Sequence, residues 1–97
     1  LDNKGKYYEV KVLTNIMSDD RRTYAIETTR KSLNMYSNHF ECAKYIKKQF
    51  ESKYGGKWCA ILMPRGYGNT SCTYYDKCYI EFNMGEFYVT IFKSLRV

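Results

Sequence analysis

The spacing of apolar residues changes twice along this chain, and this change constrains the fold more than any other feature. From Tyr8 to Leu13 or Thr14, apolar and polar residues alternate, as in a half-buried strand. Over residues 19–36 and 39–54, apolar residues recur three and four positions apart, as on one face of a helix. Alternation returns in the last third of the chain. The order predicts an α+β fold, β-α-α-β-β-β-β, with two helices on one face of an antiparallel sheet.

Residues with capping preferences mark the ends of both predicted helices. Ser18 offers a side-chain oxygen to the first helix, and the two aspartates that follow it favour a helix N-terminus. Asn38 can cap the second helix, and Gly55-Gly56 ends it, because glycine adopts the left-handed conformation readily. The inward-facing residues are expected to be Arg22, Ala25, Ile26, Thr29, Leu33 and Tyr36 in the first helix, and Cys42, Ala43, Ile46, Phe50 and Tyr54 in the second.

Three of the four strands predicted after the helices carry a clear pattern. Trp58–Met63 is continuously apolar, which predicts a central strand, while residues 78–83 and 87–92 alternate around a tight turn at residues 84–86. The segment Asn69–Thr73 has no large apolar side chain to fix its register, and neither proline nor charge to protect it from pairing. We therefore expect an edge strand with which another chain pairs.

Length and composition limit the chain to one small domain. Its 97 residues, 44% hydrophobic and 18% aromatic, suffice for a single core and argue against disorder. We expect a linker or tail over residues 1–6 and the domain over residues 7–97. The four cysteines form no Cys-x-x-Cys pair and there is a single histidine, so no metal site and no cofactor are expected. No apolar run is long enough for membrane insertion, and a cytoplasmic location with reduced thiols follows.

The formal net charge of +6 attracts acidic partners in general but does not identify a binding site. The basic residues are scattered at helical spacings without a nucleic-acid motif, so solvated helix faces are expected and nucleic-acid binding is unlikely. No nucleophile with a base and no paired carboxylates near a glycine elbow occur, so we expect no catalytic residues. The alternative function is a basic, tyrosine-rich domain that binds single-stranded nucleic acid by stacking.

Several short blocks resemble the dynein light chain family in order and spacing. The blocks are Ile46-Lys47-Lys48-Gln49-Phe50 with Lys53-Tyr54 and Trp58, Met84-Gly85-Glu86, and Phe92-Lys93-Ser94, with matches at Met17-Ser18, Leu33 and Tyr36. The similarity covers about residues 10–94. It implies a strand-exchanged homodimer, in which a strand over about residues 67–74 crosses to the partner subunit's sheet.

The resemblance also implies where partner peptides bind. In the family they add as a further strand to the outer edge of the crossing strand, in a groove floored by sheet residues and walled by the second helix of the opposite subunit. The residues implied for this groove are His39, Phe40, Tyr67, Gly68, Asn69, Thr70, Ser71, Cys72, Thr73, Tyr74, Tyr79 and Glu81. Those implied for the dimer interface are Trp58, Cys59, Tyr67, Cys72 and Tyr74.

The chain departs from the family at positions that affect both properties. His39-Phe40 stands where the family has the Glu-Lys pair that reads a glutamine, and Glu81 and Asn83 replace two aromatic floor residues, so altered peptide preference is expected. Cys59 replaces a family histidine whose protonation splits the dimer, which predicts a dimer insensitive to mild acid.

The divergence also resembles the dynein-light-chain-like domain of flatworm tegumental proteins, which carry calcium-binding EF-hands upstream. No Asp-x-Asp-x-Asp-Gly loop occurs in this chain, so calcium is expected to bind elsewhere. The partners implied are a second copy of the chain and extended peptides, among them dynein intermediate chain. The locations implied are the cytoplasm, the cytoskeleton or the tegument.

Overall fold

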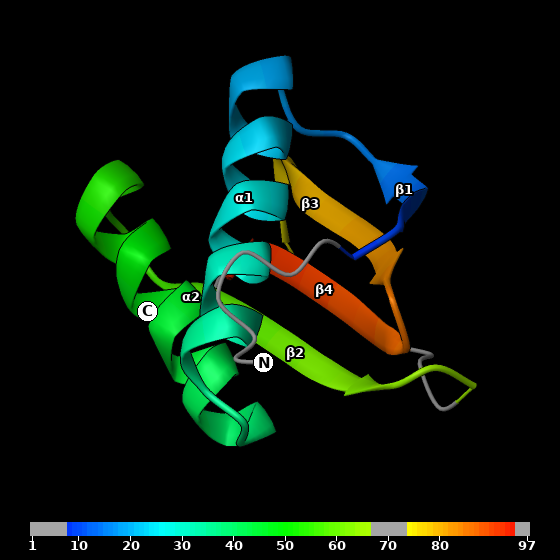
Figure 1. Cartoon of the computed structure of the whole chain (residues 1–97). Helices are drawn as coiled ribbons and strands as arrows, with labels where there is room; N and C mark the ends of the chain where they lie inside the picture. Colours follow the sequence, from blue (N-terminus) through cyan, green and yellow to red (C-terminus); the bar gives the residue numbers. More distant parts are fainter. Residues whose placement is uncertain (1–7, 67–73, 95–97) are drawn as a thin grey trace.

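The computed structural model describes residues 8–66 and 74–94. Its elements are β1 (Val10–Asn15), α1 (Asp19–Met35), α2 (His39–Tyr54), β2 (Trp58–Pro64), β3 (Tyr74–Met84) and β4 (Phe87–Ser94). The α+β class and the order of these elements are confirmed (Figure 1). The predicted edge strand at residues 69–73 lies outside the described residues.

The described strands form one antiparallel sheet in the order β1-β3-β4-β2. Both helices lie on the same side of it (Figure 1). The prediction that residues 58–63 form a central strand is wrong for the described sheet, in which β4 is central and β2 lies at an edge. An apolar run reports burial on both faces of a strand, and it does not say which strands lie beside it.

Local signals place the helix ends as the sequence predicts. The Ser18 hydroxyl accepts a hydrogen bond from the Arg21 N–H, and the Asn38 side chain accepts from the N–H groups of Phe40 and Glu41. Gly55 ends α2 with a φ of 74°, a conformation that favours glycine. Helix α1 ends at Met35, one residue earlier than predicted.

The core lies between the helices and one face of the sheet. Its largest fully buried side chains are those of Trp58, Phe50, Phe82, Ile46, Ile80, Met84 and Ile91. Trp58 packs against Phe50 with ring centroids 4.8 Å apart, and its indole N–H donates to the Gly55 carbonyl oxygen at 2.8 Å. This arrangement fixes the end of α2 to the start of β2.

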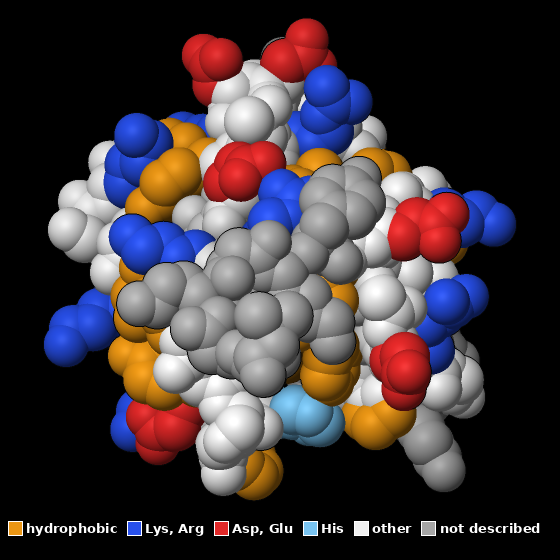
Figure 2. Space-filling view, viewed as in Figure 1, with side chains coloured by type: hydrophobic (Ala, Val, Ile, Leu, Met, Phe, Trp, Pro, Cys, Tyr) orange, Lys and Arg blue, Asp and Glu red, His pale blue; other side chains and the backbone are white. Residues whose placement is uncertain are grey.

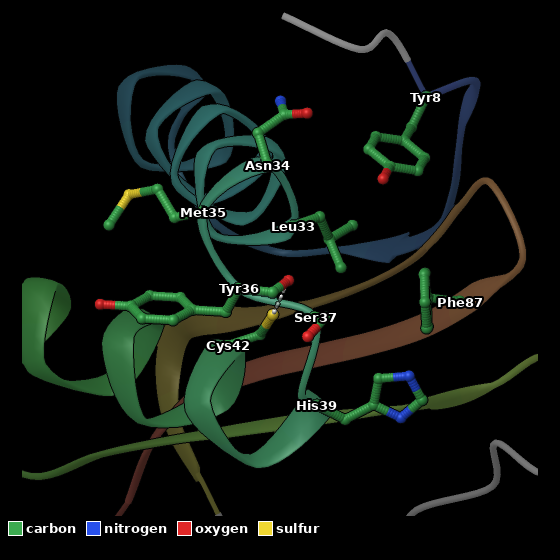
Figure 3. A pocket seen from close by; sticks show the side chains of 9 residues that line it. All are labelled: Tyr8, Leu33, Asn34, Met35, Tyr36, Ser37, His39, Cys42 and Phe87. Carbon is green, nitrogen blue, oxygen red and sulfur yellow. Dashed lines mark hydrogen bonds between the residues drawn. The ribbon is translucent and has the colours of Figure 1, made fainter. Parts of the chain in front are cut away.

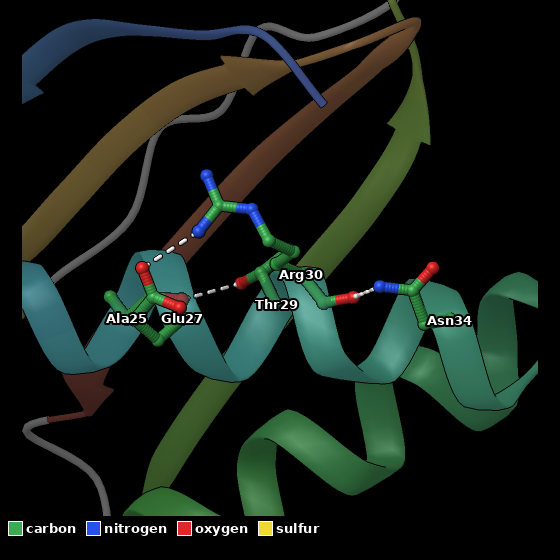
Figure 4. A network of polar contacts seen from close by, with 5 residues as sticks. All are labelled: Ala25, Glu27, Thr29, Arg30 and Asn34. Atoms are coloured by element: carbon green, nitrogen blue, oxygen red, sulfur yellow. Dashed lines mark hydrogen bonds and ion pairs between the residues drawn. The ribbon is translucent and has the colours of Figure 1, made fainter. Parts of the chain in front are cut away.

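Polar side chains of helix α1 donate hydrogen bonds to backbone carbonyl oxygens of the same helix. The Thr29 hydroxyl donates to the Ala25 carbonyl oxygen at 2.8 Å, and the Asn34 amide donates to the Arg30 carbonyl oxygen at 3.1 Å (Figure 4). Arg30 also pairs with Glu27 at 2.7 Å. Of the predicted inward residues, Ala25, Thr29 and Leu33 are buried.

Charges of both signs are spread over the face shown in Figure 2. Lysine and arginine side chains lie at several separate places on it and do not gather in one patch. This distribution matches the scattered charge of the sequence.

Candidate functional site

Three cross-strand rows of β3, β4 and β2 lie on the sheet face opposite the helices, which we call the second face, and β1 adds Thr14 to the second row and Lys11 to the third. Strand pairing aligns Tyr79, Phe92 and Cys59 in the first row, Glu81, Thr90 and Ile61 in the second, and Asn83, Tyr88 and Met63 in the third. Side chains directly opposite on paired strands point to the same face. Predicted groove residues Tyr79 and Glu81 and predicted interface residue Cys59 therefore share one surface.

The centre of the second face is buried although no helix packs on it. Tyr79, Tyr88 and Phe92 are 6%, 4% and 6% exposed, and Thr90 is fully buried. The β2 residues of this face, Cys59, Ile61 and Met63, are half-buried. The central strand β4 thus buries side chains on both of its faces.

Polar groups occupy the middle of this otherwise aromatic surface. The Tyr88 hydroxyl donates a hydrogen bond to Oε2 of Glu81, across the diagonal between rows two and three. The buried Thr90 Oγ1 has no hydrogen-bond partner in residues 8–66 and 74–94. A buried hydroxyl without a partner costs stability, so Thr90 has a hydrogen-bonding capacity that the described residues leave unused.

Strand β2 borders the second face and is an edge of the sheet. In the described part of the chain it pairs on one side only, with β4, in an unbroken register from Trp58 to Pro64. An edge strand presents backbone donors and acceptors to which another strand can add. The sheet thus offers an edge and a buried face next to each other.

The predicted wall residues lie elsewhere, at the start of α2. The His39 ring packs edge-to-face on Phe87 with centroids 4.8 Å apart, and Phe40 is 80% exposed. Phe87 packs against the core between the helices and the sheet, so His39 is on the helix side of the sheet. One subunit therefore does not bring His39 together with Tyr79 and Glu81.

A cleft of about 460 Å³ opens beside His39 (Figure 3). It is lined by Tyr8, Leu33, Asn34, Met35, Tyr36, Ser37, His39, Cys42 and Phe87. The buried Cys42 thiol lies 3.4 Å from the Ser32 carbonyl oxygen and 3.7 Å from that of Tyr36. Burial raises the pKa of this thiol, so it stays protonated near neutral pH.

The remaining predicted site residues divide into two groups. Trp58 is fully buried in the subunit core and presents no surface to a second copy in this structure. Tyr74 belongs to β3, and its backbone pairs with Ser94. Tyr67, Gly68, Asn69, Thr70, Ser71, Cys72 and Thr73 lie outside the described residues, so their roles stay predictions.

Sequence reasoning missed Tyr88 and Thr90 as residues of the second face. The alternation of the last strand already placed Tyr88, Thr90 and Phe92 on one side, opposite the core residues Val89 and Ile91. That signal shows which side a residue faces, but the contact with Glu81 depends on strand register.

Two features are absent from the described residues. In residues 8–66 and 74–94, histidine, cysteine and carboxylate side chains form no cluster of three or more that would suit a metal ion. In the same residues, no helix has the length and apolar content needed to cross a membrane.

The fold and the site define a small α+β module that has helices on one face of its described sheet and an edge strand beside the other. Comparison with known proteins agrees. The family model for dynein light chain type 1 matches residues 9–94. The cytoplasmic dynein light chain of Emericella nidulans is 30% identical over 78 residues, which are 80% of this chain and 81% of that protein. This chain belongs to the dynein light chain family.

Solved structures with low sequence identity share the fold. The dynein light chain-like domain of FhCaBP2, a calcium-binding protein of Fasciola hepatica, matches with a TM-score of 0.76 at 16% identity, over 97% of both chains. The crystal structure of the dynein light chain-like domain of CsTAL3 matches with a TM-score of 0.71 at 14% identity, over 87% of this chain and 90% of that one.

Proposed function

We propose that this chain is a non-catalytic adaptor module that dimerises and takes an extended segment of a partner protein by β-strand addition at the edge of the crossing strand. The observation that carries the proposal is the division of the predicted groove. Tyr79 and Glu81 lie on the second face, whereas His39 and Phe40 lie at the start of α2 on the helix side. Two subunits are needed for these residues to line one groove, as the family's groove requires.

The second face and β2 support the dimer. An exposed edge strand of seven residues with apolar side chains is a liability for a lone subunit, because it can pair with any other strand. A strand from a second copy, added beside β2, removes this liability and extends the sheet. It also makes β2 an interior strand, which suits its continuous apolar sequence.

Strand addition supplies enough free energy for a useful adaptor. About five or six backbone hydrogen bonds contribute roughly 0.5–1.5 kcal/mol each after exchange with water. With one or two buried side chains, this offsets the cost of association and gives micromolar binding, about 8 kcal/mol. Two grooves in one dimer add avidity for a partner that is itself two-chained.

Peptide preference differs from that of ordinary family members. His39-Phe40 provides no Glu-Lys pair for a glutamine, so a Thr-Gln-Thr peptide binds more weakly here than to an ordinary member. Calorimetry with the same peptide on both proteins tests this, and equal affinities would contradict it.

The dimer is tested by placing a charge at the proposed interface. Cys59→Glu introduces a carboxylate on the second face beside the β2 edge, and we expect it to sediment as a monomer where the natural chain sediments as a dimer. Leu13→Glu is the matched control, because Leu13 lies on β1 at the opposite edge and is 44% exposed. A monomeric natural chain, or a Cys59→Glu variant that remains dimeric with unchanged circular dichroism, would overturn the proposal.

The likeness to FhCaBP2 supports a wider setting. We propose that the chain works in the cytoplasm as the light-chain-like domain of a longer calcium-binding tegumental protein, whose EF-hands and not this domain bind calcium. Calcium titration of this chain is then expected to show no binding, while the protein isolated from its source has a larger mass and binds calcium. A mass equal to that of this chain would refute the wider setting and leave the adaptor proposal intact.

A further inference from the structure

Glu81 is a carboxylate in the middle row of the second face, where the β1 residues opposite this row and the next are Thr14 and Lys11. It is half-buried in the middle row, directly opposite the fully buried Thr90.

No basic side chain in the described part of the chain neutralises Glu81. Ion pairs in these residues join Arg22 to Asp19, Arg30 to Glu27 and Lys47 to Glu51. Lys11 lies one row from Glu81 on the same face and forms no ion pair with it. Glu81 receives one hydrogen bond, from the Tyr88 hydroxyl to Oε2. This contact orients the carboxylate and leaves Oε1 available as an acceptor.

Thr90 supplies an independent observation at the same place. Its Oγ1 is buried and has no hydrogen-bond partner in the described residues, although buried polar groups are normally paired. The hydroxyl and the carboxylate sit on cross-strand neighbours of one face. The half-buried carboxylate thus accepts one hydrogen bond, and the hydroxyl opposite it is buried without a partner in the described residues.

We propose that the partner segment taken at this site carries a basic residue, preferably arginine, over Glu81. This inference rests on the proposed function. An apolar peptide residue at that position would desolvate the carboxylate without compensating it, whereas a guanidinium offers several N–H donors in a rigid fork that suits a carboxylate. Lysine supplies the charge but not the fork, so it ranks second.

The charge of the whole chain limits what surrounds this basic residue. A formal net charge of +6 repels a uniformly basic segment. The segment is therefore a peptide with one basic residue at a fixed position among neutral or acidic ones. A requirement for one basic residue at a fixed position distinguishes recognition by Glu81 from general charge attraction.

Selection from a displayed library of random 12-residue peptides tests the inference. The full chain is the bait, alongside variants Glu81→Gln, Glu81→Lys and the matched control Glu86→Gln, in which the lost carboxylate is exposed in the adjacent turn. We expect the natural chain and Glu86→Gln to select arginine at one position. Glu81→Gln loses that preference, and Glu81→Lys selects aspartate or glutamate there.

Affinities of one selected arginine peptide give the size of the effect. Glu81→Gln is expected to weaken binding about tenfold, the loss of one charge-assisted contact, and Glu86→Gln to leave it within about twofold. If Glu81→Lys does not fold, the Glu81→Gln comparison alone decides. Peptides selected without a basic position, or equal affinity for Glu81→Gln, would overturn this inference and leave the adaptor intact. No selected peptide at all would overturn both.

Discussion

Replacing Thr90 with valine is expected to stabilise the protein, although most substitutions of buried residues destabilise. Thr90 is fully buried in the central strand β4, and its hydroxyl has no hydrogen-bond partner in residues 8–66 and 74–94. Valine keeps the branched shape and the strand preference of threonine and removes the polar atom. The variant therefore keeps the packing and loses the desolvation cost.

The size of the effect follows from the cost of burying an unpaired hydroxyl. Mutational data put this cost at about 1–3 kcal/mol, so we expect Thr90→Val to raise the free energy of unfolding by at least about 1 kcal/mol. For a domain of this size, 1 kcal/mol corresponds to a shift in Tm of roughly 4–8 °C.

Thr29 provides a matched control for Thr90→Val. It is also fully buried, but its hydroxyl donates to the Ala25 carbonyl oxygen at 2.8 Å. Thr29→Val removes a hydrogen bond that is made, so it is expected to lower the free energy of unfolding by about 0.5–1.5 kcal/mol. Urea unfolding at one protomer concentration compares the two, because the stability of a dimer depends on concentration. If both variants lose stability alike, the Thr90 hydroxyl is satisfied and the reasoning fails.

Three further predictions concern pH. Burial raises the pKa of the Cys42 thiol in the folded protein. The contribution of the neutral thiol to the free energy of unfolding is therefore complete below roughly pH 8.5 and is lost as the pH rises through the folded pKa. Urea titrations of Cys42→Ala should show a smaller loss of stability at alkaline pH. Hydrogen bonds from Lys47 and the Trp58 N–H lower the pKa of the Glu51 carboxyl. The contribution of the carboxylate to the free energy of unfolding is therefore present above roughly pH 4.3 and is lost as the pH falls through the lower folded pKa. If Glu51→Gln loses stability in acid as steeply as the natural chain does, this reasoning is wrong. The dimer should persist at about pH 5, because a thiol gains no charge on acidification, while Cys59→His should dissociate near pH 6.5, as sedimentation would reveal.

The elements of the fold were predictable because each has a local cause. Ser18, Asn38 and Gly55 mark helix ends through hydrogen bonds and a backbone conformation that depend only on nearby residues. The lateral order of strands depends on contacts between distant segments, and no local signal contains it. This is why the apolar run at residues 58–63 suggested a central strand, while the described sheet has β2 at an edge.

The site residues also include some that local sequence signals predict and some that depend on contacts between distant segments. Alternation and family resemblance placed Tyr79 and Glu81 on a common surface, and strand pairing agrees. The role of Thr90 was not predictable, because a threonine in a strand is ordinary and only coordinates show whether its hydroxyl has a partner. Likewise, the contact between Tyr88 and Glu81 requires the register of β3 against β4.

The second face combines features that favour a bound state over a lone subunit. Its half-buried β2 side chains, Cys59, Ile61 and Met63, gain from being covered, whereas the half-buried Glu81 carboxylate loses from being covered without a partner. A segment that supplies donors at the middle row resolves this conflict, and an apolar segment does not. Binding to the folded state at one hundred times the dissociation constant adds about 2.7 kcal/mol to stability. A basic peptide should therefore raise the Tm of the natural chain more than that of Glu81→Gln, so that the face selects its partner by the polar groups that a lone subunit leaves unsatisfied.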